Sequence, residues 1–101
     1  LSTEYVYYTS TTKNVTVFLI NSGTIGDVAI KSITIRFDDG TMVKSLQNPI
    51  LRLSNGTVVN DLDQGQEGSV QINTDGLTLG AHYLVTIVTV RGAVFNAGFV
   101  A

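Results

Sequence analysis

Short apolar runs recur along the whole chain and are separated by residues that favour turns. No helical period persists for three turns, whereas the runs have the length and the Val, Ile, Thr and Tyr content of strands. The expected strands cover residues 4–9, 14–21, 28–37, 41–44, 50–53, 57–59, 68–73, 82–92 and 94–100. Seven or more strands at this spacing predict an all-β, immunoglobulin-like β-sandwich. Without an internal repeat or a linker, residues 1–101 are expected to form one domain.

The longest run, residues 82–92, is apolar on both of its faces. Either Arg91-Gly92 or Gly92-Ala93 could form a two-residue hairpin turn before the last strand, and both choices keep the same residues together on each face. One face then carries two phenylalanines and is assigned to the core: Leu84, Thr86, Val88, Val90, Phe95, Ala97 and Phe99. The outward face is expected to contain Tyr83, Val85, Ile87, Thr89, Val94, Asn96, Gly98 and Val100.

An apolar strip on an outward face usually marks a contact surface. The pattern therefore predicts a protein interface at Tyr83, Val85, Ile87, Val94 and Val100, which would pair two copies or dock a neighbouring subunit in a filament. The competing interpretation is that residues 41–62 fold over this strip. The first strand adds Tyr5 and Tyr7 to the predicted interface, because tyrosine is enriched at interfaces; these two rings could equally cap the core.

Composition excludes several kinds of protein. Charged residues make up 14% of the 101 residues and the net charge is -2, which provides no basic field for nucleic acid. There is no cysteine, and therefore no disulfide framework or zinc-thiolate site. No apolar run reaches the length of about 18 residues that a transmembrane helix needs.

The residues that could carry chemistry are few. His82 is the only histidine and has no second histidine or cysteine with which to share a metal. Asp61, Asp63 and Glu67 superficially resemble a calcium loop but lack the EF-hand pattern, so a solvated loop is favoured. No serine nucleophile motif accompanies the histidine. We expect no catalytic, cofactor or metal residues. Asn14 and Asn55 begin N-x-T triplets and are candidate glycosylation sites.

Two segments carry a resemblance to a known family. They are INSGTIGDVAIKSITI at 20–35, with its N-x-G turn at Asn21 and Gly23, and the stretch from Leu62 to Val100. The second segment contains an L-x-x-G-Q turn and ends on a Y-x-V-T-x-V-T-x-x-G hairpin. Together they resemble the soluble domain of archaeal type-IV-pilin-like proteins, a group of archaellins, adhesive pilins and the archaellum stator proteins FlaF and FlaG. Gln64 stands where this group commonly has proline.

The resemblance implies a task of protein binding outside the cytoplasmic membrane. The compact chain is most similar to the stator proteins, which implies an anchoring role through contacts with archaellum or surface-layer (S-layer) proteins. The alternatives are a subunit of an adhesive pilus or archaellum filament and, more remotely, a secreted enzyme or sugar-binding module. Members of the group carry an apolar N-terminal helix as a membrane anchor or filament core. That helix is absent from this sequence, so membrane attachment is expected only through it.

Overall fold

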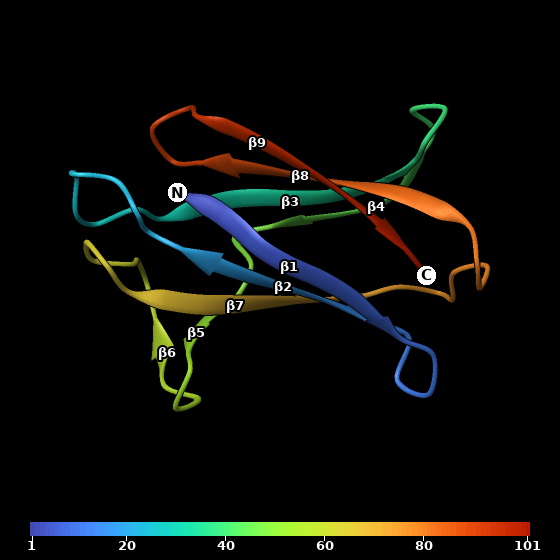
Figure 1. Ribbon diagram of the computed structural model, residues 1–101, viewed down its shortest axis with the longest axis horizontal. Coiled ribbons are helices and arrows are strands. Elements are labelled where there is room, and N and C mark those ends of the chain that lie inside the picture. The colour runs from blue at the N-terminus through green and yellow to red at the C-terminus, as the bar shows by residue number, and fades with distance from the viewer.

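The chain folds into two antiparallel β-sheets packed face to face (Figure 1). The computed structural model describes all residues from Leu1 to Ala101. The first sheet has the order β1-β2-β7-β5-β6 and the second the order β4-β3-β8-β9. The strands are β1 (Ser2–Thr9), β2 (Asn14–Ile20), β3 (Ile30–Phe37), β4 (Met42–Gln47), β5 (Leu51–Leu53), β6 (Val58–Val59), β7 (Glu67–Asn73), β8 (His82–Thr89) and β9 (Val94–Val100). The prediction of an all-β sandwich with seven or more strands is confirmed.

The core lies between the two sheets and follows the period of two that strands impose. On β2 the alternate residues Val15, Val17 and Leu19 are buried, and they face inward together with Val70 and Ile72 of the neighbouring β7. The second sheet contributes its own inward residues, which join them in one cluster: Ile30, Ile33, Ile35, Tyr83, Val85, Ile87 and Phe99. Burial of each large aliphatic side chain stabilises the fold by about 1.5–3 kcal/mol.

The turn between β8 and β9 contains three residues, Val90, Arg91 and Gly92. Thr89 donates its backbone N–H to the carbonyl of Ala93 (2.9 Å), and Gly92 donates to the carbonyl of Thr89 (2.9 Å). Gly92 has a φ of 93°, the left-handed conformation that closes a three-residue hairpin loop and that glycine adopts without strain. The expected two-residue turn is therefore wrong by one residue.

The additional residue in the turn reverses which face of β8 lies on the same side of the sheet as each face of β9. Val88 now lies opposite Val94, and Tyr83 lies opposite Phe99, so the odd-numbered residues of both strands face the core. The interface predicted at Tyr83, Val85 and Ile87 is wrong, because none of these side chains is more than 3% exposed. The opposite sheet covers them, and residues 41–62 contribute to this cover as the competing interpretation expected, through β5 and β6 of that sheet and through Leu51 and Leu62, which are buried in the same core cluster.

The residues that replace them on the outer face are less apolar. Leu84, Thr86 and Val88 are half-buried there, beside Val94 and Val100 of β9, which are each more than half exposed, as expected. Phe95 is half-buried on the inner side. The even-numbered face of β8 therefore remains available for contacts, but with a different set of side chains from the predicted set.

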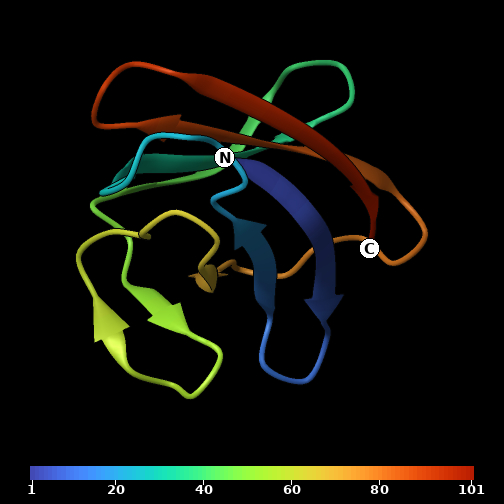
Figure 2. The same ribbon diagram turned by 60° about the vertical axis from the view of Figure 1, so that its left-hand side comes forward.

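Two edge strands close one side of the sandwich. β1 ends the first sheet, β9 ends the second, and the two strands pack beside each other (Figures 1 and 2). No β-ladder joins them, so both strands keep a free backbone edge. The structure contains no helix with the length and apolarity needed to cross a bilayer.

Candidate interaction surfaces

Two exposed tyrosines and a half-buried phenylalanine form a cluster on the outer face of β1 and β2, which we call the aromatic surface. Tyr5 lies directly opposite Phe18, and Tyr7 lies opposite Thr16. The ring centroids of Tyr5 and Tyr7 are 5.4 Å and 6.0 Å from that of Phe18, and the two tyrosine rings are 5.5 Å apart. Tyr5 is 58% exposed and Tyr7 is 37% exposed. The two tyrosines therefore lie outside the core, together with a phenylalanine that the sequence did not single out.

The strand register explains why these rings face outward. A bulge between Thr3 and Tyr5 sets the alternation, so Val6 and Tyr8 turn inward against Val17 and Val15 of β2. The hydroxyl of Tyr8 accepts a hydrogen bond from the backbone N–H of Leu77 (3.1 Å), which fixes this ring under a loop. Phe18 falls in the same outward row because β2 continues the alternation.

The outer face of the second sheet carries an uncharged central row. From β4 to β9 this row contains Ser45, Thr34, Thr86 and Asn96. The hydroxyls of Thr34 and Ser45 are 3.2 Å apart, and Thr86 donates to the Oδ1 of Asn96 (2.7 Å). Each of these two pairs is thus joined by a hydrogen bond within the sheet, and the exposed Val94 and Val100 of β9 lie on the same face.

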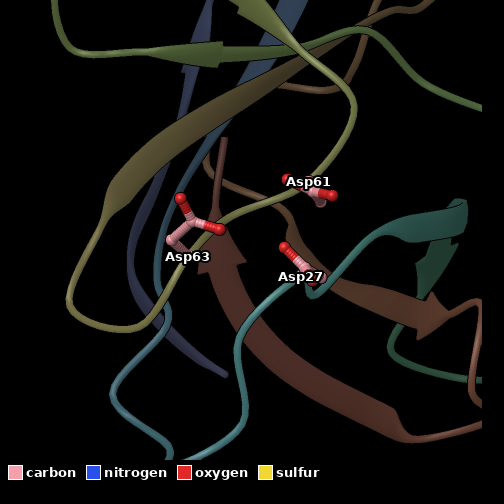
Figure 3. A group of neighbouring side chains, drawn as sticks. All are labelled: Asp27, Asp61 and Asp63. Carbon is pink, nitrogen blue, oxygen red and sulfur yellow. The ribbon is translucent and has the colours of Figure 1, made fainter.

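Three aspartates meet at one end of the sandwich (Figure 3). An isolated antiparallel bridge pairs Val28 with Leu62, and it brings Asp27 beside Asp61 and Asp63. Carboxylate oxygens of the three residues lie within 4.8 Å of one another. A hydrogen bond with Asp27 raises the pKa of Asp63, and desolvation and the charges of Asp27 and Asp61 act in the same direction.

This arrangement differs from the acidic loop considered from the sequence. Glu67 is the first residue of β7, where it pairs with Ile20 of β2 and is not part of the cluster. The third member of the cluster is instead Asp27, which lies in a loop far away in the sequence, and no local pattern could have identified it. The three aspartates are the residues whose positions would permit a shared cation.

An open apolar cleft of about 440 Å³ lies next to Asp27 at the same end of the molecule. One wall is the loop between β2 and β3, and the other is the β8–β9 turn. The lining residues are mainly apolar: Leu1, Asn21, Gly23, Thr24, Ile25, Asp27, Val28, Ala29, Thr89, Val90, Arg91, Ala93 and Phe95.

Asn21 holds the first wall of the cleft in place. Its buried side-chain amide donates to the carbonyls of Ile25 (2.9 Å) and Leu62 (3.0 Å), and its Oδ1 accepts from the N–H of Gly23 (3.3 Å). These contacts give the N-x-G turn a physical role, because one buried asparagine satisfies the backbone of two loops. The backbone N–H of Val90 also donates to the carbonyl of Ala29 (3.0 Å), which ties the two walls together.

The remaining candidate residues lie on the surface. His82 is exposed at the first residue of β8, opposite Val100. Asn55 is exposed in the turn between β5 and β6, where its Oδ1 accepts from the N–H of Thr57 (3.0 Å). Asn14 is half-buried at the start of β2, and its Oδ1 accepts from the side-chain amide of Asn73 (2.9 Å). The two candidate glycosylation sites therefore differ in accessibility.

These features define an antiparallel β-sandwich whose candidate contact surfaces lie on its outside. No protein-family model matches the chain, and neither does any curated protein sequence. Among solved structures, the archaellum periplasmic stator protein FlaG from Sulfolobus acidocaldarius is similar, with a TM-score of 0.74 and 20% identity over 96% of this chain and 95% of that chain. A chain in the complex of the archaellum periplasmic stator proteins FlaF and FlaG from the same organism is also similar, with a TM-score of 0.71 and 20% identity over 96% of this chain and 85% of that chain.

At this identity the similarity establishes a shared fold. It covers nearly the whole of both chains in the first comparison, so the two proteins share their complete sandwich and not a single motif. The resemblance of the sequence to the archaellum stator proteins is confirmed at the level of the fold.

Proposed function

We propose that this chain is the extracytoplasmic β-sandwich domain of an archaellum stator protein, with a static anchoring role that depends on protein contacts. The observation that carries this proposal is the near-complete overlap of its fold with that of FlaG. Its partner would be a second stator domain, by analogy with the complex of FlaF and FlaG. S-layer proteins are further candidates, and attachment to the membrane would require an N-terminal helix outside this sequence.

A non-catalytic role agrees with the chemistry of the surface. His82 and the aspartate cluster lie on different elements, and the apolar cleft adjoins the aspartates and not the histidine. Acyl transfer needs a nucleophile beside a base, and no hydrogen bond joins His82 to a hydroxyl group; the three aspartates offer carboxylates alone, without the histidine that a zinc hydrolase site uses. We therefore propose binding as the function, without cofactor, metal or nucleic acid.

The aromatic surface is the contact site that we propose for the stator partner. Exposed tyrosine rings give a large contact area at a small cost in conformational entropy, because each ring has only two side-chain torsions. Phe18 adds an apolar centre between Tyr5 and Tyr7, and aromatic residues of this kind often dominate binding energy.

The test uses the purified domain and a FlaF-type domain from the same genome. Simultaneous Tyr5→Ala and Tyr7→Ala substitution should weaken complex formation at least tenfold in Kd, measured by calorimetry, with an unchanged melting temperature. Val58→Ala on β6 is the control, since Val58 is more than half exposed, like Tyr5, and lies on the opposite edge of the same sheet. Equal binding by all three proteins would contradict the assignment.

The second candidate is a subunit of an archaellum filament or an adhesive pilus. The outer face of the second sheet favours it, because its central row is uncharged and the exposed Val94 and Val100 on the same face could pair with another copy. Light scattering should then show concentration-dependent oligomers that Val94→Glu dissociates. A domain that stays monomeric at high concentration, and does so equally with Val94→Glu, would argue against this role.

Asn55 is the glycan acceptor that we propose, in preference to Asn14. Asn55 lies in an exposed turn, whereas Asn14 is half-buried and bonded to Asn73 within the sheet. Mass spectrometry of the protein from its native host should find a glycan on the peptide that contains Asn55. A glycan on Asn14 and none on Asn55 would contradict this preference.

A further inference from the structure

The apolar cleft beside the aspartates has the properties of a second binding site, separate from the aromatic surface. Its volume of about 440 Å³ lies within the range of about 300–1,000 Å³ that is usual for ligand sites. Two exposed aliphatic residues stand at its rim, Ile25 at 57% and Val90 at 62% exposure. They line the cleft together with the half-buried Leu1 and Phe95. An aliphatic side chain placed between them would remove apolar surface from water on both sides.

The walls of the cleft are held in place by hydrogen bonds within the fold. Asn21 bonds the carbonyl of Ile25 in the β2–β3 loop and that of Leu62 before β7, and the backbone N–H of Val90 donates to the carbonyl of Ala29 in the other wall. A preformed site spares an incoming segment the cost of ordering the protein around it.

Charge at the end of the cleft selects the occupant. Asp27 lines the cleft, and carboxylate oxygens of Asp61 and Asp63 lie within 4.8 Å of its own. Arg91, on the turn across the cleft, is the one basic side chain of the lining. Three neighbouring carboxylates repel one another, and an ammonium or guanidinium group placed among them would relieve that repulsion.

We propose that this cleft docks a segment of a partner protein that carries an aliphatic side chain followed directly by lysine or arginine. The aliphatic group lies between Ile25 and Val90, and the cation reaches Asp27 and its two neighbouring aspartates. The site does not depend on the stator assignment, because its argument uses only the shape and the charge of this end of the sandwich.

The experiment is an NMR titration of the isotope-labelled domain with short capped peptides. The probe is acetyl-Gly-Leu-Lys-Gly-amide, and the matched peptides replace Leu by Gly or Lys by Glu. We expect amide shifts confined to residues 25–29 and 89–93, with a Kd at least tenfold lower for the Leu-Lys peptide than for either matched peptide.

Charge-neutral variants separate the contribution of the aliphatic contact from that of the cation contact. Asp27→Asn combined with Asp61→Asn should bring the Lys and Glu peptides within twofold of each other, while Asp38→Asn, in a turn at another part of the chain, should leave the preference unchanged. Equal binding of the Lys and Glu peptides by the unaltered domain would overturn the proposal, as would the absence of shifts at 10 mM peptide. Concentration-dependent shifts at the cleft without peptide would also overturn it, since a second copy would then be the occupant. The amide spectrum of each variant reports whether it is folded.

Discussion

The three-residue turn between β8 and β9 can be tested by comparing two neighbouring residues of β8. Ile87 is 1% exposed in the core, whereas Val88 is half-buried on the outer face. Ile87→Ala removes three carbons, each worth about 0.8 kcal/mol of transfer free energy. The cavity that remains between two packed sheets raises the expected loss of stability to about 3–4 kcal/mol.

The same reasoning predicts a much smaller effect one residue later. Val88→Ala removes two methyl groups that are already partly exposed to water, so we expect a loss of about 0.8 kcal/mol. The two substitutions lie on one strand and both produce alanine, and for this reason differences in strand propensity are largely matched. The difference between them therefore reports which face of β8 is buried.

Urea unfolding followed by circular dichroism measures both values. The midpoint should fall far more for Ile87→Ala than for Val88→Ala, at a common slope. Because small domains are stable by only about 5–15 kcal/mol, the Ile87 variant is expected to be only marginally folded at 37 °C. A larger loss for Val88→Ala would show that the turn has two residues and that the faces are exchanged.

Three further predictions concern other sites. Gly68→Ala should cost about 1–3 kcal/mol in urea unfolding, because its new Cβ would lie 2.9 Å from the Cδ2 of Leu62 and 3.0 Å from the backbone oxygen of Arg52; Gly26→Ala, with no atom within 4 Å, is the control. Asp63 has a raised pKa in the folded state, so its ionisation opposes folding above that pKa and ceases to do so as the pH falls below it. Asp63→Asn should therefore reduce the rise in melting temperature that accompanies acidification from neutral pH to the ordinary carboxyl range. An unchanged profile would contradict the contact with Asp27. His82→Ala should change stability by less than about 0.5 kcal/mol, and loss of any hydrolytic activity in this variant would overturn the non-enzymatic assignment.

Local patterns were sufficient where a residue acts through its own strand or turn. The alternation of Val15, Val17 and Leu19 predicts an inward face for β2, and the structure buries all three. Asn55-Gly56 predicts a hairpin, and the structure places it between the paired strands β5 and β6. These signals are reliable because strand period and turn geometry depend on a few consecutive residues.

The candidate sites depend on contacts between distant segments. The sequence places Asp27 at a separation of 34 positions from Asp61, and only the bridge between Val28 and Leu62 brings their carboxylates together. Phe18 joins Tyr5 and Tyr7 in the same way, through the register of β1 against β2. Registers of this kind are set by the complete sheet.

The sequence by itself determined the fold class, because the period of two and the turn residues leave a sandwich as the way to bury so many strands. It also limited the chemistry, since one histidine, no cysteine and few charges provide little for catalysis. The tertiary structure alone decided which face of β8 is buried. Side chains alternate with every residue, so one additional residue in the turn after Thr89 moves Tyr83, Val85 and Ile87 from the expected surface into the core.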